Sequence, residues 1–295
     1  RLDQELQLYY RYLQRYGRPD VMIVGSSRSL QGVDPTALRE SLAAQGYPNA
    51  KVYNFGINGA TAQVMQLLLT EVLAPEQLPK MLIWGDGSRA FNSGRRDITY
   101  NGIVASAGYR HLQAGYHPIP TRIFSTGSIP VANQSKTADL SPEPAIAPDL
   151  DRYGFNPLSD RYDPQTYYQR FPVVLGRYDS NYQDFQLWGN QSNATVAIAD
   201  FAKTYQIPLI FVSLPLTDDY LADPTRSQYE QRFHQHMGEL ARQRGFTFID
   251  YHQHPNLIQN NFFVDPSHIN RYGAAAVAQQ LAADAQIPWQ ILRTP

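Results

Sequence analysis

The stretch Val21-Met22-Ile23-Val24-Gly25-Ser26-Ser27-Arg28-Ser29 gives the first indication of how this chain folds. Its four apolar residues are typical of a buried parallel strand, and the small polar residues after them indicate a tight turn. Ligands and reacting groups gather at the carboxyl ends of strands in open α/β sheets, where helix amides can stabilise negative charge. Ser27, or failing that Ser26, is therefore a candidate nucleophile. An ordinary turn or helix N-cap is the alternative.

Similar apolar runs recur along the chain, and segments with helical periodicity lie between them. This alternation is typical of a parallel sheet with helices on both faces. We expect an α/β fold, a three-layer α/β/α sandwich with a five-stranded parallel sheet. The expected strands span residues 21–24, 51–54, 81–84, 208–214 and 246–250, and the expected helices span residues 2–16, 35–44, 62–73, 194–205, 226–244 and 269–283.

Residues 91–190 break this pattern, because prolines are scattered through them and sustained apolar runs are scarce. The segment is too long for an ordinary connecting loop, and long loops are usually lids, binding segments or disorder. We expect one α/β domain over residues 1–295, with 91–190 as an irregular insertion or lid over the sheet's carboxyl edge. A surface excursion without function is the alternative.

Composition narrows the class of protein. The chain has 295 residues, of which 43% are hydrophobic and 17% charged, so it is a folded globular protein. The net charge of -1 gives no electrostatic reason to expect nucleic acid as a partner. Cysteine is absent, which excludes disulfides, thiolate metal sites and cysteine nucleophiles. Because the sequence begins at Arg1 and not at Met, we expect a removed segment that could have been a membrane tether.

A second candidate group lies at Val264-Asp265-Pro266-Ser267-His268, just before the last expected helix. A catalytic histidine must reach the serine hydroxyl with one ring nitrogen, and a carboxylate must hold the other. Two residues between Asp265 and His268 allow both side chains to converge on one site. The alternative is that Asp265 caps the helix and His268 lies in its first turn.

Three features in this order resemble the SGNH (GDSL-like) hydrolase superfamily over residues 20 to 90 and 205 to 285. The first block of that family reads Gly-Asp-Ser, and here Gly25-Ser26-Ser27 places the nucleophile on Ser27. The second block resembles residues 54–61, with Gly59 as an oxyanion-hole residue. The fifth block resembles residues 265–268, with His268 as the base and Asp265 as its partner. The resemblance implies a sheet in flavodoxin-like order.

The third block departs from the family pattern, which is Gly-x-Asn-Asp. Here the matching stretch is Trp84-Gly85-Asp86-Gly87-Ser88-Arg89, which has no Asn to donate to the oxyanion. Loss of one such donor costs about 10²–10³ in rate. Asn58, Arg28 or Arg89 could replace it, and the site could also be slow or inactive. Arg28 and Arg89 could instead bind an anionic substrate, and a structural ion pair is the alternative for Arg28.

Four histidines, His234, His236, His252 and His254, lie close together in the sequence. His234 and His236 are two residues apart on an expected helix, so they do not share a face. The ligand spacing of a metal site is absent, and we expect neither a metal nor a cofactor. The phosphate- and dinucleotide-binding motifs Gly-x-x-x-x-Gly-Lys-Ser/Thr and Gly-x-Gly-x-x-Gly follow none of the strands.

The sequence therefore predicts a serine esterase or O-acyltransferase with a Ser27-His268-Asp265 triad. The pattern looks closer to the divergent bacterial branch that includes the D-alanine transfer protein and polysaccharide O-acetyltransferase-like proteins. That resemblance implies an extracytoplasmic protein acting on an acylated carbohydrate or a cell-envelope polymer. The alternative is a binding or scaffolding protein of the cell envelope that keeps the fold without the chemistry.

Overall fold

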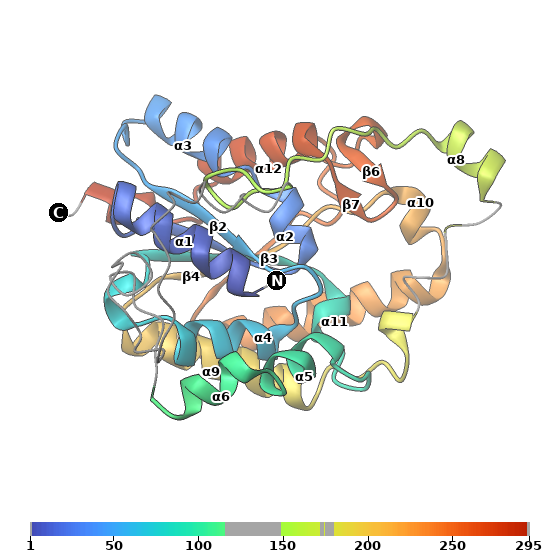
Figure 1. Ribbon diagram of the computed structural model, residues 1–295. Helices are drawn as coiled ribbons and strands as arrows, with labels where there is room; N and C mark the ends of the chain where they lie inside the picture. Colours follow the sequence, from blue (N-terminus) through green and yellow to red (C-terminus); the bar gives the residue numbers. More distant parts are fainter. Residues whose placement is uncertain (1, 116–148, 172–173, 175–179, 294–295) are drawn as a thin grey trace, which may run out of the picture.

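A computed structural model describes residues 2–115, 149–171, 174 and 180–293 (Figure 1). Five parallel strands form one sheet in the order β2-β1-β3-β4-β5, which confirms the expected α/β class and the flavodoxin-like order. A short antiparallel pair, β6 and β7, stands apart from it. The strands are β1 Val21–Gly25, β2 Val52–Gly56, β3 Met81–Asp86, β4 Leu209–Ser213, β5 Thr247–Asp250, β6 Phe263–Asp265 and β7 His268–Ile269.

Helices cover both faces of the sheet (Figure 1). One face packs against α3 and α12, and the other packs against α1, α4, α9 and α11. The helices of the described chain are α1 Leu2–Tyr16, α2 Ser27–Gly32, α3 Pro35–Ala44, α4 Ala62–Leu67, α5 Ile98–Val104, α6 Ala107–Gln113, α8 Pro164–Arg170, α9 Asn190–Thr204, α10 Asp218–Leu221, α11 Pro224–Arg244 and α12 Arg271–Ala283, with a π-helical turn at Leu68–Val72.

Alternation along the strands divides the core into two layers. In β1, Val21 and Ile23 face the α3–α12 layer, while Met22 and Val24 face the layer that holds α1, α4 and α9. All four side chains are fully buried. Burial of each such side chain stabilises the fold by about 1.5–3 kcal/mol, which explains why short apolar runs were sufficient to locate the strands.

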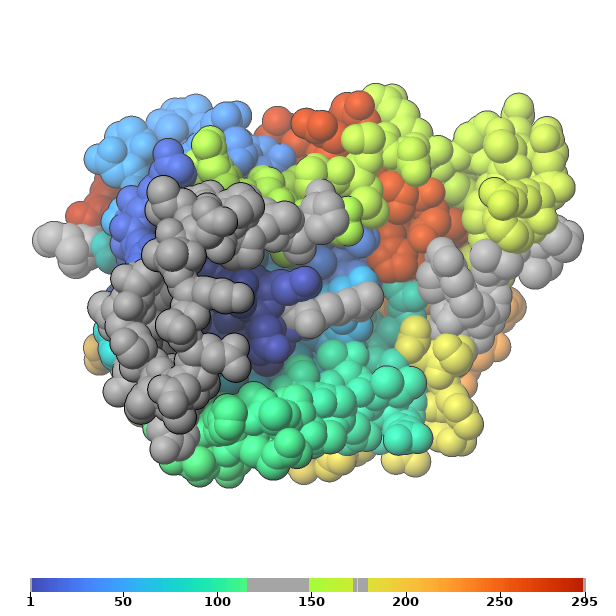
Figure 2. Space-filling view, in the orientation of Figure 1, coloured from blue at the N-terminus to red at the C-terminus, as the bar shows by residue number. Residues whose placement is uncertain are grey.

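Helix α1 packs on the sheet. The ring of Tyr9 lies 4.9 Å from that of Tyr53 and 5.3 Å from that of Phe55, both on β2. Figure 2 shows α1, in dark blue, between the layer of α3 and α12 and the green α5–α6 segment. None of the helices in the described part of the chain is both long and apolar enough to cross a bilayer.

The described part of the expected insertion is partly regular, because it contains α5, α6 and α8. Its residues 153–162 lead from edge strand β2 past α2 to β6, where the Tyr162 amide donates to the Phe263 carbonyl. The Tyr153 carbonyl accepts a hydrogen bond at 2.9 Å from the backbone N–H of Asn54, on edge strand β2. Gly154 follows with a φ of 81°, and a Cβ there would lie 2.0 Å from the Asn54 carbonyl oxygen. Residues 116–148 lie outside the described residues, and their role as a lid stays a prediction.

The structure differs from the sequence-based expectation near the ends of elements. Strand β3 continues to Asp86, two residues beyond the expected end, because it pairs with β4 as far as Ser213. Helix α12 begins at Arg271, two residues later than expected. Its N-cap is Asn270, whose side-chain oxygen accepts from the amides of Tyr272 and Gly273. Helix α2 and the β6–β7 hairpin were not expected at all, and both carry candidate site residues.

Candidate active site

Ser27 is the first residue of α2, directly after β1, and its side chain is half-buried. A buried carboxylate on the neighbouring strand holds the turn that leads to it. Asp86 accepts hydrogen bonds from the Ser26 amide at 2.8 Å and from the Ser26 hydroxyl at 2.9 Å. The turn itself requires glycine at position 25, where φ is 140° and a Cβ would lie 2.2 Å from the Gly85 carbonyl oxygen.

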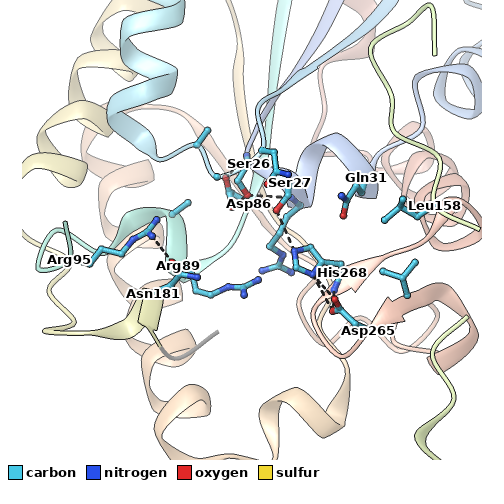
Figure 3. A pocket seen from close by; sticks show the side chains of 16 residues that line it. Ser26, Ser27, Gln31, Asp86, Arg89, Arg95, Leu158, Asn181, Asp265 and His268 are labelled. Carbon is cyan, nitrogen blue, oxygen red and sulfur yellow. Dashed lines mark hydrogen bonds and ion pairs between the residues drawn. The ribbon is translucent and has the colours of Figure 1, made fainter. Parts of the chain in front are cut away.

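His268 and Asp265 lie on the β6–β7 hairpin. Asp265 Oδ1 accepts from the amides of Ser267 at 2.8 Å and His268 at 2.9 Å, which fixes the carboxylate against the turn. His268 Nδ1 lies 3.0 Å from Asp265 Oδ2 and 3.1 Å from Oδ1. The other ring nitrogen, Nε2, lies 3.3 Å from Ser27 Oγ (Figure 3). The structure therefore brings together three side chains that the sequence separates by up to 241 positions.

Two alternative roles considered from the sequence, Asp265 as a helix cap and Ser26 as the nucleophile, disagree with this geometry. Asp265 does not cap α12, because Asn270 occupies that position. Ser26 is the N-cap of α2, and its hydroxyl pairs with Asp86 and not with His268 (Figure 3). Ser27 is thus the serine that faces the histidine.

The site opens into a pocket of about 460 Å³, which lies within the usual range for small-molecule sites. Gly59 and Asn58, the predicted oxyanion-hole residues, line this pocket together with Ser27 and His268. Within the described residues, no hydrogen bond uses the backbone N–H of Ser27 or of Gly59. Gly59 has a φ of 78°, in the left-handed region that favours glycine.

Arg28 also lines the pocket, and its side chain is almost completely buried. Its Nη2 donates to the carbonyls of Leu214 at 2.6 Å and Pro215 at 2.9 Å, beyond the end of β4. A Cβ on Gly87 would lie 1.9 Å from Arg28 Nη1, so the guanidinium fills the space beside Gly87. Burial lowers the pKa of Arg28, while the nearby charges of Glu230 and Asp86 act to raise it.

Arg89 lies on the opposite side of the pocket, with its side chain extended toward His268 (Figure 3). It donates to the Ser267 hydroxyl at 3.2 Å, and its guanidinium lies over the Tyr220 ring at 5.6 Å. Substrate binding by Arg28 or Arg89 stays a prediction. The residue that sequence reasoning missed is Asp86, whose role depends on a contact between strands that no local pattern signals.

Asp86 is almost completely buried, and its burial and its neighbours have opposite effects on its pKa. Burial raises its pKa to about 6, while the charge of Arg28 and the hydrogen bonds from Ser26 and Gly87 oppose the rise. A carboxyl group at this position therefore changes its charge in the mildly acidic range. Two direct hydrogen bonds from Ser26 join this carboxyl group to the turn that presents Ser27.

Comparisons with known proteins find only distant structural similarity. No family model matches the sequence, and no curated protein matches it. BT4096, a gut microbial diltiazem-metabolizing enzyme, is 13% identical with a TM-score of 0.43; the overlap covers 88% of this chain but 45% of that enzyme.

Two further structures are similar over nearly their whole length. A catalytic mutant of Axe2, an acetylxylan esterase from Geobacillus stearothermophilus, is 9% identical, with a TM-score of 0.47 over 91% of this chain and 94% of Axe2. A Desulfitobacterium hafniense protein assigned to the lipolytic G-D-S-L family is 12% identical, with a TM-score of 0.41 over 89% of this chain and 97% of that one. Likenesses this distant say nothing of substrate or activity.

Proposed function

We propose that this protein is a serine esterase or O-acyltransferase of the SGNH type, with Ser27 as nucleophile, His268 as general base and Asp265 as the residue that orients the base. The observation that carries the proposal is the continuous chain of contacts from Ser27 Oγ through the His268 ring to the Asp265 carboxylate. The distance of 3.3 Å between Ser27 and His268 is slightly longer than an optimal hydrogen bond. Such distances are common in free enzymes and shorten when substrate binds.

The proposed reaction has two steps. His268 Nε2 takes the proton of Ser27 Oγ as that oxygen attacks the ester carbonyl, and the protonated ring then gives the proton to the leaving alcohol. The acyl group is now bound to Ser27. Water or a sugar hydroxyl attacks it after losing a proton to His268, and the serine is regenerated with that proton. Asp265 holds the ring in the tautomer that leaves Nε2 free to accept.

The oxyanion formed in each step needs donors, and the chain offers three. The amides of Ser27 and Gly59 border the pocket and are not used elsewhere in the described residues. The third is Arg28, whose guanidinium occupies the space beside Gly87, where the family pattern has its Asn. Within the described residues its Nη1 makes no hydrogen bond, since both carbonyl contacts use Nη2. A charged donor at this position replaces the missing amide.

The substrate that we propose is an acylated carbohydrate or cell-envelope polymer outside the cytoplasm. The lining of the pocket supports a hydroxyl-rich ligand. Polar side chains, among them those of Gln31, Arg95 and Asn181, border the pocket.

A Ser27→Ala variant tests the proposal with a small aryl acetate and with acetylated oligosaccharides. Hydrolysis should fall to background, while the melting temperature stays within a few degrees of the parent. Ser227→Ala, on the exposed side of α11, is the matched control and should keep full activity. Residual turnover in Ser27→Ala equal to that of the parent contradicts the nucleophile assignment.

The second candidate function is a cell-envelope binding protein without catalysis, and the missing third-block Asn favours it. A serine-reactive phosphonate separates the two candidates. Stoichiometric labelling at Ser27, absent in His268→Ala, supports the enzyme. A folded protein that binds acetylated oligosaccharides but takes up no label supports the binding protein.

A further inference from the structure

A second group of convergent side chains lies at the carboxyl edge of the sheet, at the end of β5. Asp250 is the last residue of β5, His252 follows it, and His234 reaches it from α11. Each of the three offers one ligand atom, and these atoms lie within 4.8 Å of one another. His252 Nδ1 lies 2.7 Å from Asp250 Oδ1, and His234 Nδ1 lies 3.6 Å from Asp250 Oδ2.

This group is separate from the Ser27 site. None of its three residues lines the pocket described above. Strands β3 and β4 lie between β1 and β5 in the sheet, so three strand spacings of about 4.8 Å place the two strand ends about 14 Å apart. The His234–Asp250–His252 group is therefore independent of the proposed acyl-transfer chemistry.

A buried serine holds the His234 ring in place. Ser213 Oγ lies 2.8 Å from His234 Nε2, and Ser213 is fully buried at the end of β4. Histidine ligands in metal sites characteristically use one ring nitrogen for the metal and the other for a fixed hydrogen bond. Because Nε2 pairs with Ser213, Nδ1 is the ring nitrogen that faces the Asp250 carboxylate, and the His252 ring lies 4.0 Å away.

The distances are close to those of a metal centre. Zinc bonds of about 2.0–2.1 Å at tetrahedral angles place ligand atoms about 3.4 Å apart. The spacings here are 2.7 Å, 3.6 Å and at most 4.8 Å, so a shift of about an ångström in a partly exposed loop completes the geometry. We propose that His234, Asp250 and His252 bind one divalent transition-metal ion, with Zn²⁺ as the expected occupant and one coordination position left for water.

Equilibrium dialysis of the tag-free protein against Zn²⁺ tests this proposal. We expect one Zn²⁺ per chain, and Co²⁺ in its place should give the visible absorption of a four-coordinate ion. A ligand that binds only the folded state raises the melting temperature, on the order of 5 °C at a hundredfold excess over Kd. His252→Gln should weaken binding by more than about 100-fold, since even the loss of an outer hydrogen-bond partner costs 10–100-fold.

Two variants keep the test decisive. His234→Gln removes the more buried ligand, and His252→Gln removes a partly exposed one, so at least one should fold normally. His111→Gln, on exposed α6, is the matched control and should bind Zn²⁺ like the parent. Absence of stoichiometric binding shows that the group is only a hydrogen-bonded His–Asp–His set and overturns the proposal. Zn²⁺ binding in both ligand variants that is as tight as in the parent overturns it as well.

Discussion

Replacing Asp265 by Asn changes one oxygen to an NH₂ group and keeps the shape of the side chain. Asp265 Oδ1 accepts from the amides of Ser267 and His268, so the Asn oxygen is expected to stay there and preserve the hairpin. The NH₂ group then takes the place of Oδ2, 3.0 Å from His268 Nδ1. Because two N–H groups repel at that distance, the imidazole should change to the tautomer with its proton on Nε2.

That tautomer is the wrong one for the proposed reaction. Its Nε2–H points at Ser27 Oγ, 3.3 Å away, and cannot accept the hydroxyl proton. In serine enzymes with this arrangement, the same tautomer change lowers kcat by about 10⁴, or about 5 kcal/mol of transition-state stabilisation. The free energy of unfolding should change by far less, because both backbone contacts of the turn survive.

The assay is hydrolysis of an aryl acetate by Asp265→Asn and the parent, followed from pH 5 to pH 9, with thermal unfolding of both proteins in parallel. We expect a loss of kcat between about 10² and 10⁴, partly recovered at high pH, where hydroxide can replace the base. A variant that keeps more than a tenth of the parental kcat refutes the role of Asp265. A melting temperature lowered by more than about 10 °C would indicate a structural role for the residue.

Two further predictions concern the floor of the site. Arg28→Ala should lower kcat by about 10²–10³, because an oxyanion donor is lost. Adding Gly87→Asn to this variant should recover part of the rate. An unchanged rate in Arg28→Ala contradicts the role of Arg28 as a donor. Asp86, with a pKa raised from 3.8 to about 6, binds a proton in the native state that the unfolded chain releases. Stability from this group is therefore full below about pH 4 and falls by up to about 3 kcal/mol as the pH rises to about 6. Urea unfolding should show this pH trend in the parent and not in Asp86→Asn.

The sheet could be predicted because its strands are buried on both sides. Runs such as Val21-Met22-Ile23-Val24 have no polar face, and each fills both core layers at once. Helix α2 and the strands β6 and β7 were missed for a related reason. A helix of six residues and strands of three and two residues are too short to show a period. Their positions are set by contacts such as the bond from the Tyr162 amide to the Phe263 carbonyl.

The contact between Ser27 and His268 could be anticipated, because strand ends in parallel sheets share one edge and the motif order resembles a known family. The proximity of His234 to His252 could not be anticipated from the sequence. Sequence spacing directs attention to His234 with His236 and to His252 with His254. In the structure, His236 Nε2 lies 3.3 Å from a different partner, the Ser192 hydroxyl. The packing of α11 against β5 determines which histidines meet. No sequence pattern within either segment indicates that contact.

The two departures from the SGNH motif pattern that the sequence resembles lie at the ends of adjacent strands, β1 and β3. The first block lacks the Asp of Gly-Asp-Ser, and a carboxylate instead reaches Ser26 from Asp86, across the β1–β3 pairing. The third block lacks its Asn at Gly87, and a guanidinium instead reaches that space from Arg28, across the same pairing. Each strand end thus supplies the group that the other lacks. The buried charges of Asp86 and Arg28 offset each other, so replacing either residue alone should disturb the turn more than replacing both together.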